Sequence, residues 1–205
     1  MTDAISLEPV PSTTGEPTLA TILRRRRSTK RFAPDPVTRR QLAHVLWAAQ
    51  GTTGGGHRTC PSAHARYPLA VTVVWGEGDG IASGVYRYVS DNHTLLPIAT
   101  GDQRGIVATA SLADQEWLSV APVLLLISGD PAAAETDFAD QPPPGRGRRY
   151  LWLEAGHASQ NVYLWAAAER LGAVLVAGFD DERLSPLLPD GHDPLAVVAV
   201  GHPAG

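Results

Sequence analysis

The sequence has little of several features that usually direct a functional interpretation. It contains one cysteine, Cys60, so neither an intrachain disulfide nor a multi-cysteine zinc module can form. No segment reaches the ~18 consecutive apolar residues of a membrane span. The 17 basic residues are outnumbered by 21 acidic ones, and the net charge of −4 disfavours a general nucleic-acid binder. We therefore expect a small molecule or another protein as the partner.

The amino-terminal residues carry no targeting signal of the secretory type. Residues 1–10 include Asp3 and Glu8 and contain no basic stretch followed by an apolar one. This composition predicts a cytoplasmic protein. Residues 1–17 are rich in Pro, Ser, Thr and Gly, which predicts a flexible, extended lead-in that buries no face. The length of the remainder, residues 18–205, suits a single domain with its own core.

Apolar periodicity predicts helices interleaved with strands after residue 18. An edge strand is expected at 85–89, short helical patterns at 102–120 and a proline-rich loop at 131–148. The other predicted helices cover 18–26, 38–50, 149–171 and 182–188, and the other predicted strands cover 69–75, 123–127, 173–179 and 195–200. Interleaving of this kind is typical of an α/β or α+β protein in which one sheet is covered by helices.

The predicted helix over 149–171 is apolar almost all round, which favours a subunit interface for part of its surface. Its polar residues Glu154, His157 and Asn161 share one stripe. That stripe has two interpretations: a catalytic group, or a hydrogen-bonded network that seals a subunit contact. The second interpretation is favoured because the helix is so apolar.

The basic residues are concentrated in one segment, Arg24–Arg31, which includes Lys30, the single lysine of the chain. Such a run is often a solvated helix face. Helical spacing, however, places Arg26 on the same side as Leu19 and Ile22. Its guanidinium must then reach out to solvent or meet an anion near the core, such as the phosphate of a cofactor.

Other polar motifs support no catalytic class. The glycine-rich run Gly51–Gly56 follows a helix and lacks the ending of a P-loop. The spacing of His57, Cys60 and His64 matches no common zinc pattern, so no metal is expected. No nucleophile elbow is present, and nothing designates a partner base for Ser62.

Taken together in their order and spacing, several stretches resemble the FMN-dependent nitroreductase superfamily. They are Arg26–Phe32, Pro61–Ala63 with Tyr67-Pro68, and Ala177–Asp180. Further stretches resemble more specifically the SagB-type (thiazole/oxazole) dehydrogenase branch. They are Gly84–Tyr88, Gln115-Glu116, Ala121-Pro122 and Tyr150–Asn161. The similarity extends from about Leu19 to Pro203.

The resemblance implies an α+β, three-layer nitroreductase-like fold, with a central mixed sheet covered by helices. It further implies an intertwined homodimer that holds FMN at the interface, with NAD(P)H as co-substrate. The residues implied to bind FMN are Arg26, Arg27, Ser28, Lys30, Pro61, Ser62, Ala63, Ala177 and Gly178. The implied catalytic residues are Lys30 and Tyr150, because Arg149-Tyr150 is the nearest match to the Lys-Tyr pair of azole-forming members.

The resemblance also assigns these groups to parts of the flavin. Arg26–Ser28 would hold the phosphate and ribityl chain, and Lys30 would face the pyrimidine edge. Pro61–Ala63 would approach the ring from the other subunit, and the backbone of Ala177 and Gly178 would lie near N5.

The implied function is an FMN-dependent oxidoreductase that passes hydride through flavin N5 between NAD(P)H and a nitroaromatic or quinone. One alternative is a SagB-type dehydrogenase that oxidises azolines with oxygen as acceptor. Another is a non-catalytic, flavin-binding subunit of a biosynthetic complex with a partner protein, suggested by the proline-rich stretch 141–147. A nucleic-acid binder resting on Arg24–Arg27 is the least supported, because a wider basic surface is missing.

Overall fold

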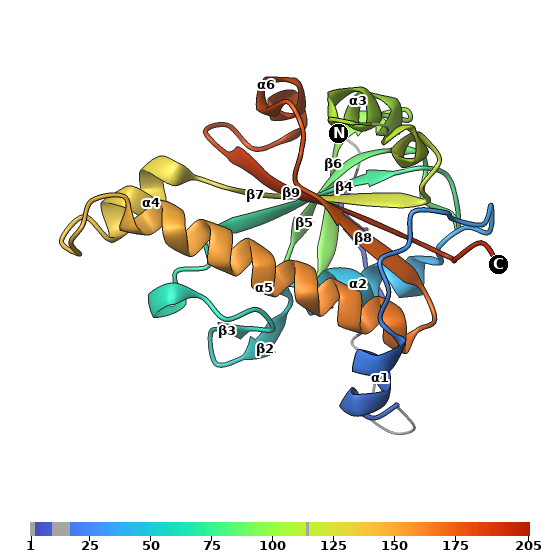
Figure 1. Ribbon diagram of the computed structural model, residues 1–205, viewed down its shortest axis with the longest axis horizontal. Helices are drawn as coiled ribbons and strands as arrows, with labels where there is room; N and C mark the ends of the chain where they lie inside the picture. Colours follow the sequence, from blue (N-terminus) through green and yellow to red (C-terminus); the bar gives the residue numbers. More distant parts are fainter. Residues whose placement is uncertain (1–2, 10–16, 114) are drawn as a thin grey trace.

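A seven-stranded sheet separates two layers of helices in the computed structural model, which describes residues 3–9, 17–113 and 115–205 (Figure 1). The strand order is β1-β6-β5-β4-β7-β9-β8. The strands of this sheet are β1 (Ile5–Ser6), β4 (Leu69–Trp75), β5 (Gly84–Val89), β6 (Thr94–Thr100), β7 (Val123–Gly129), β8 (Gly172–Val176) and β9 (Asp193–Gly201). A separate hairpin consists of β2 (Thr52–Gly54) and β3 (His57–Arg58).

The helices lie on both sides of this sheet. The α-helices are α1 (Leu19–Arg25), α2 (Arg39–Gln50), α3 (Arg104–Ala110), α4 (Pro131–Asp137), α5 (Arg146–Ala168) and α6 (Asp181–Leu184). The 3-10 helices are η1 (Ala63–Ala65), η2 (Glu116–Ser119) and η3 (Ser185–Leu187). Figure 1 shows α2 and α5 on one side of the strands, and α3 and α6 on the other. None of the helices in the described ranges is long and apolar enough to cross a membrane.

The strand pairings of the sheet are antiparallel, and one parallel bridge, between Ser28 and Ala173, lies at its β8 edge. The central pair, β4 and β7, is in register from Leu69 opposite Gly129 to Trp75 opposite Val123. The bridge makes the sheet mixed at its margin. The predicted α+β, three-layer architecture is therefore confirmed.

Two hydrophobic clusters fill the space between the layers. Val73 belongs to the cluster beneath α2 and α5, whereas its neighbour Val74 belongs to the cluster beneath α3, η2 and α6. Both side chains are fully buried. The near-continuous apolar sequence of β4 follows from this, since successive side chains of a strand point to opposite faces and here both faces are covered.

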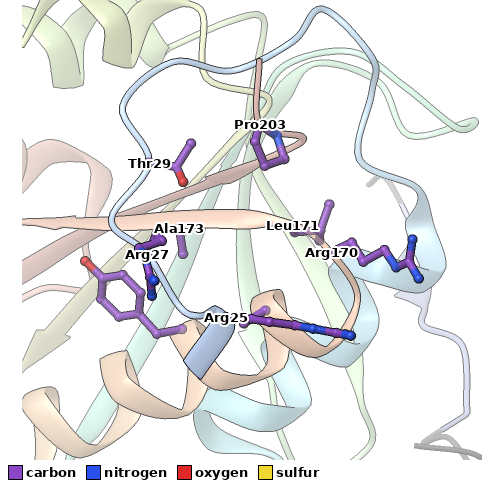
Figure 2. A pocket seen from close by; sticks show the side chains of 9 residues that line it. Arg25, Arg27, Thr29, Arg170, Leu171, Ala173 and Pro203 are labelled. Atoms are coloured by element: carbon purple, nitrogen blue, oxygen red, sulfur yellow. The ribbon is translucent and has the colours of Figure 1, made fainter. Parts of the chain in front are cut away.

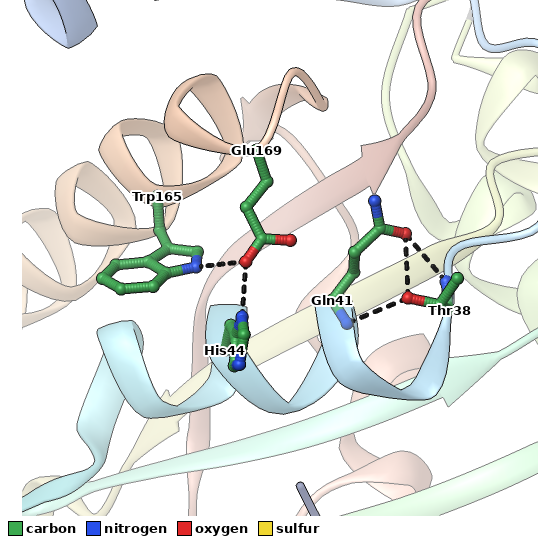
Figure 3. Close-up of polar contacts among 5 residues, drawn as sticks. All are labelled: Thr38, Gln41, His44, Trp165 and Glu169. Atoms are coloured by element: carbon green, nitrogen blue, oxygen red, sulfur yellow. Dashed lines mark hydrogen bonds and ion pairs between the residues drawn. The ribbon is translucent and has the colours of Figure 1, made fainter. Parts of the chain in front are cut away.

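Helix α2 begins and packs as its sequence predicts. Thr38 caps it through a reciprocal capping box with Gln41, which stabilises the first turn (Figure 3). Further along, the buried His44 contacts Glu169 with 2.5 Å between Nδ1 and Oε1, and the Trp165 indole donates to the same oxygen (Figure 3). These bonds join α2 to the carboxyl-terminal end of α5.

Two expectations about the middle of the chain are wrong, and one strand was not predicted. The predicted edge strand is β5, an interior strand that pairs with both β4 and β6. Strand β6 was not predicted, because Pro97 interrupts a short run with few β-branched residues; the proline is accommodated at an irregular register next to the sheet margin. The stretch 131–148 is a loop only in part, since it contains α4 and the first turn of α5.

The amino-terminal segment contributes to the sheet. Ile5 and Ser6 pair with β6, and Leu7 is buried at 7% exposure. The expectation that residues 1–17 bury no face is therefore wrong for Ile5 and Leu7, because the uncovered edge of β6 offers this segment hydrogen bonds and apolar contact. Residues 1–2 and 10–16 of the predicted lead-in lie outside the described residues.

Candidate functional site

An open groove of about 550 Å³ lies where the end of α1, the end of α5 and strand β8 meet (Figure 2). Its lining residues come from both ends of the described domain. They are Arg25, Arg27, Thr29, Tyr163, Ala167, Arg170, Leu171, Ala173 and Pro203. The chain reaches this position because Thr29 donates its amide N–H to the carbonyl of Ala173, 3.0 Å away, which attaches the segment after α1 to β8.

The groove is strongly cationic. Arg25, Arg27 and Arg170 line it, and no carboxylate is among the lining residues. Arg27 is oriented by the backbone of the residues before it, since its Nη1 donates to the carbonyls of Arg24 and Arg26 at 2.8 Å each. Guanidinium groups form the strongest hydrogen bonds with phosphate and carboxylate oxygens. The groove is therefore suited to an anion.

Arg26 takes a different position from the one expected. Its Cζ lies 5.3 Å from the centre of the Tyr163 ring, a cation–π contact, and it does not line the groove. The apolar side of α1 on which it was placed is not buried: Leu19 and Leu23 are 61% and 50% exposed. Arg26 instead packs against the wall that Tyr163 forms.

Tyr163 connects three elements beside the groove. Its hydroxyl accepts a hydrogen bond from the Leu175 amide at 2.7 Å and lies 3.4 Å from the Ser28 hydroxyl. Helix α5, strand β8 and the segment after α1 are therefore held at one place. Arg27 and Ser28, both predicted to bind a phosphate, lie at the groove or directly beside it.

Lys30, Ala177 and Gly178 lie towards the opposite face of the sheet. The exposed Lys30 has its Nζ 5.9 Å from the centre of the Trp117 ring, and Trp117 packs against the cluster beneath α3. Gly178 accepts a hydrogen bond from the Leu112 amide at 2.8 Å. Ala177 and Gly178 are both exposed and directly follow the end of β8. Strand β8 thus has the arginine groove on one side and these residues at its end.

A second, smaller pocket of about 220 Å³ contains the predicted residues Pro61, Ser62 and Ala63. The other lining residues come from the first half of α5: Tyr150, Leu153, Glu154 and His157. Tyr150 donates its hydroxyl to Gln141 Oε1 at 2.9 Å, and its ring packs edge-on against Phe138. The structure therefore brings Tyr150 next to Pro61–Ala63 and not next to Lys30.

Glu154 holds the pocket together from inside one chain. Its Oε1 accepts hydrogen bonds from the Ser62 hydroxyl and the Ala63 amide, both at 2.9 Å, and Asn161 donates to the carbonyl of Thr59 at 3.1 Å. Within one chain, Glu154 and Asn161 therefore attach residues 59–63 to α5, and His157 is the exposed member of the stripe. That the stripe also seals a subunit contact stays a prediction.

Burial governs the acid–base properties of this pocket. Burial raises the pKa of Glu154, although hydrogen bonds from Ala63 and Ser62 and the nearby His157 lower it. Burial likewise raises the pKa of the Cys60 thiol to about 12, with the negative charge of Glu154 acting in the same direction. At both positions burial disfavours the charged form.

The two sites lie at different positions along α5. Nine residues separate Glu154 from Tyr163, which corresponds to about 14 Å of helix rise. One chain therefore presents two separate places, the groove beside β8 and the pocket of Pro61–Ala63, which we call half-sites because the sequence predicts that they serve different flavins. Directly before Glu154, α5 presents apolar surface to solvent, with Trp152 and Leu153 55% and 52% exposed.

Some residues of the groove were missed by the sequence reasoning. Arg25, Tyr163 and Arg170 were not among the residues expected to bind the cofactor. A signal did exist for Arg170, because it directly precedes the helix stop Leu171-Gly172, where a cation suits the negative end of a helix dipole. Tyr163 carries no local signal, since its contacts with Arg26 and Leu175 depend on chain packing.

Comparisons with known proteins identify the family to which this architecture belongs. Residues 23–202 match the nitroreductase family. A protein of Methanocaldococcus jannaschii named as a nitroreductase is 35% identical over 184 residues, which cover 89% of this chain and 90% of the relative. The chain is therefore a member of the nitroreductase family, whose activity class is oxidoreductase.

Solved structures share the fold. A Ralstonia eutropha protein named as a nitroreductase has a TM-score of 0.81 at 28% identity, covering 98% of this chain and 90% of that one. In the Escherichia coli microcin synthetase McbBCD complex, one chain has a TM-score of 0.75 at 21% identity, with 98% and 78% covered. A Desulfovibrio desulfuricans protein named as a nitroreductase, solved with FMN, has a TM-score of 0.61 at 23% identity, with 93% and 88% covered.

Proposed function

We propose that the protein is an FMN-dependent oxidoreductase that passes hydride through flavin N5 from NAD(P)H to a small nitroaromatic or quinone. The observation that carries the proposal is the groove beside β8, where Arg25, Arg27 and Arg170 stand together without a lining carboxylate. Family membership supports this chemistry, and the FMN bound to the D. desulfuricans protein supports the choice of flavin.

The donors of the groove fit the phosphate end of FMN. A phosphate dianion is best held by several guanidinium groups and hydroxyls. Arg27, Arg25 and Arg170 supply the charge, and the Thr29 and Ser28 hydroxyls lie at or beside the groove. Arg26 contributes indirectly, by packing on Tyr163. We therefore assign Arg25 and Arg170 to the phosphate site in addition to Arg27 and Ser28.

The groups around the end of β8 suit the ring of the flavin. When bound, FMN supplies a reversible two-electron carrier. Lys30 would face its pyrimidine edge, where a cation placed in advance stabilises the negative charge of the reduced form. The backbone of Ala177 and Gly178 would lie near N5, and both residues are exposed.

A complete site requires a second subunit. Pro61–Ala63 lie at the other half-site and would contact the ring of the partner's flavin, and Tyr150 would reach the same place. The exposed Trp152 and Leu153 on α5 offer apolar surface for a homodimer. Light scattering should give twice the chain mass, and the flavin content of the holoenzyme should be two FMN per dimer.

The decisive experiment is a visible spectrum followed by an anaerobic titration. Purified protein should show bound flavin, and NADPH or NADH should bleach it; a nitroaromatic or quinone should then restore the colour. Protein that stays colourless after FMN is added, or flavin that neither nicotinamide reduces, would contradict this activity.

A second candidate is a SagB-type dehydrogenase that works with a biosynthetic partner protein and oxidises azolines with oxygen as acceptor. The specific observation in its favour is that Tyr150, the expected catalytic residue of that branch, lines the pocket with Pro61–Ala63. The structural likeness to the microcin synthetase chain supports it at the level of fold. Flavin inert to NAD(P)H but reduced by an azoline-bearing peptide would favour this activity, and the consumption of oxygen on reoxidation would complete the case.

A further inference from the structure

The two carboxyl oxygens of Glu154 are in different situations. Oε1 accepts two hydrogen bonds, from Ser62 and Ala63. Oε2 is buried and has no hydrogen-bond partner among the described residues. Glu154 as a whole is only 3% exposed. Both donors therefore depend on a single oxygen of a group that is almost completely removed from solvent.

Burial and the neighbouring groups act on the charge of Glu154 in opposite directions. Burial raises the pKa of the carboxyl group, whereas the hydrogen bonds from Ser62 and Ala63 and the exposed His157 lower it, and burial has the larger effect. The ion pairs found in the described part of the chain do not include Glu154. The other titratable groups near it are the Cys60 thiol and the Tyr150 hydroxyl, while Arg58 acts on Cys60. A buried carboxyl group without a paired cation is costly to ionise.

The segment attached to Glu154 has a strained backbone. His64, Ala65 and Tyr67 have φ values of 52°, 54° and 51°, in the left-handed region that suits glycine. Each such residue costs about 1 kcal/mol or more and persists only when neighbouring contacts hold it. Ser62 helps by accepting a hydrogen bond from the Tyr67 amide at 2.8 Å. The shape of the segment thus depends on Ser62, and Ser62 depends on Glu154.

We propose that Glu154 is a positioning residue for the flavin site: its Oε1 fixes Ser62 and Ala63, and with them the wall formed by Pro61–Ala63, at a buried place where ionisation of the carboxyl group costs stability. That this wall contacts flavin rests on the proposed function. The way in which Glu154 holds the wall rests only on contacts within one chain. The two parts can be tested separately.

The charge state is tested by the unfolding midpoint of the apoprotein between pH 5 and 9. Burial raises the pKa of Glu154 in the native state, whereas its pKa in the unfolded chain is about 4.3. The native pKa is the higher one, so the stability of the wild type is greatest at low pH and is lost as pH rises through the native value. Glu154→Gln retains the Oε1 acceptor and cannot ionise. Its midpoint should exceed that of the wild type by a margin that grows with pH.

The control for this comparison is Glu77→Gln, which removes an exposed carboxylate. It should follow the wild-type profile at every pH. A Glu154→Gln protein that is less stable than the wild type at pH 8 would show that the ionised form is the one the fold requires, and would overturn the proposal.

The positioning role is tested by amide exchange and by FMN affinity at pH 6. Exchange of peptides covering residues 59–67 should be faster in Glu154→Ala and unchanged in Glu154→Gln. FMN fluorescence should give a Kd for Glu154→Gln within about twofold of the wild type, and a Kd for Glu154→Ala about tenfold weaker, which corresponds to one lost hydrogen-bonded contact. Ser62→Ala added to Glu154→Ala should weaken binding no further, since both act through one contact.

Unchanged exchange and unchanged FMN affinity in a folded Glu154→Ala protein would overturn the positioning role. Failure of the wild type itself to bind FMN would contradict the proposed function. In that case the pH dependence of the apoprotein and the exchange of residues 59–67 would still decide the state and the structural role of Glu154.

Discussion

The two half-sites along α5 use ionisable groups in opposite ways. At the β8 end, Arg25, Arg27 and Arg170 face an open groove, where water can solvate them until an anion arrives. In the pocket of Pro61–Ala63, Glu154 is enclosed, and burial raises its pKa. An exposed charge can exchange solvent for a ligand, whereas a buried one must be neutral or paired. The first half-site is therefore suited to binding, and the second to positioning.

The groove end also has its own support. Glu169 accepts hydrogen bonds from Trp165 and His44, and Arg170 is the next residue (Figure 3). The left-handed φ of 61° at Arg170 directs the chain away from the helix into the turn before β8. The position of this arginine is thus set by a buried contact between α2 and α5.

The largest expected effect is on the groove. The double variant Arg27→Ala/Arg170→Ala removes two guanidinium groups, each worth about 1.5–3 kcal/mol in a charge-assisted contact. The Kd for FMN should rise about a hundredfold or more, as measured by fluorescence titration. Arg24→Ala, at an exposed residue that does not line the groove, should stay close to the wild type. A similar loss in Arg24→Ala would mean that the effect is one of overall charge.

The next effect is on stability. His44→Ala leaves a cavity and removes the partner of Glu169, so the free energy of unfolding should fall by about 2–4 kcal/mol in a denaturant titration. Glu182→Ala, at an exposed position of α6, should change it by no more than about 0.5 kcal/mol. If the two substitutions had equal effects, the contact between α2 and α5 could no longer be regarded as the support of the groove.

A smaller and more selective effect is expected at Lys30. Lys30→Ala should slow flavin reduction by NADPH about tenfold, since one cation no longer stabilises the reduced form. The Kd for FMN should change less than about threefold, because the phosphate is held elsewhere. Stopped-flow absorbance and fluorescence titration separate the two quantities. Arg31→Ala is the neighbouring control, and a Lys30→Ala protein that loses FMN but reduces at the normal rate would reverse the assignment.

The smallest effect is expected in the enclosed pocket. Burial raises the pKa of Cys60 to about 12, so almost no thiolate is present at pH 8. Treatment of the native protein with iodoacetamide at that pH should leave FMN binding unchanged and Cys60 unmodified by mass spectrometry. The same treatment in urea should alkylate it. Rapid labelling of the native protein would show that the pocket opens.

Local patterns were sufficient for the elements whose environment is uniform. The capping box of Thr38 and the stop at Gly51 predict α2, and the continuous apolar runs of β4 and β7 predict strands covered on both faces. Strand β6 and the interior place of β5 were not predictable in this way. Their positions depend on which strands pair, and a strand with Pro97 is tolerated only because the adjoining β1 is short.

The residues of the candidate site likewise fall into those that local sequence can identify and those that only the fold brings together. The motifs at Arg26–Lys30, Pro61–Ala63 and Ala177-Gly178 are contiguous in sequence, and a resemblance between sequences can identify them. Arg25 and Arg170 belong to segments more than a hundred residues apart, and the groove forms only because Thr29 and Ala173 are hydrogen-bonded across the β8 edge. No local pattern encodes that contact.

By itself the sequence determined the class of fold, the helical and strand segments with clear periodicity, and the motifs that resemble a flavin site. The tertiary structure decided which side chains meet. It placed Arg26 on Tyr163, brought Arg170 beside Arg27, and enclosed Glu154 over Ser62. The physical reason is that periodicity reports local backbone geometry, whereas burial, charge pairing and hydrogen-bond partners arise from contacts between distant segments.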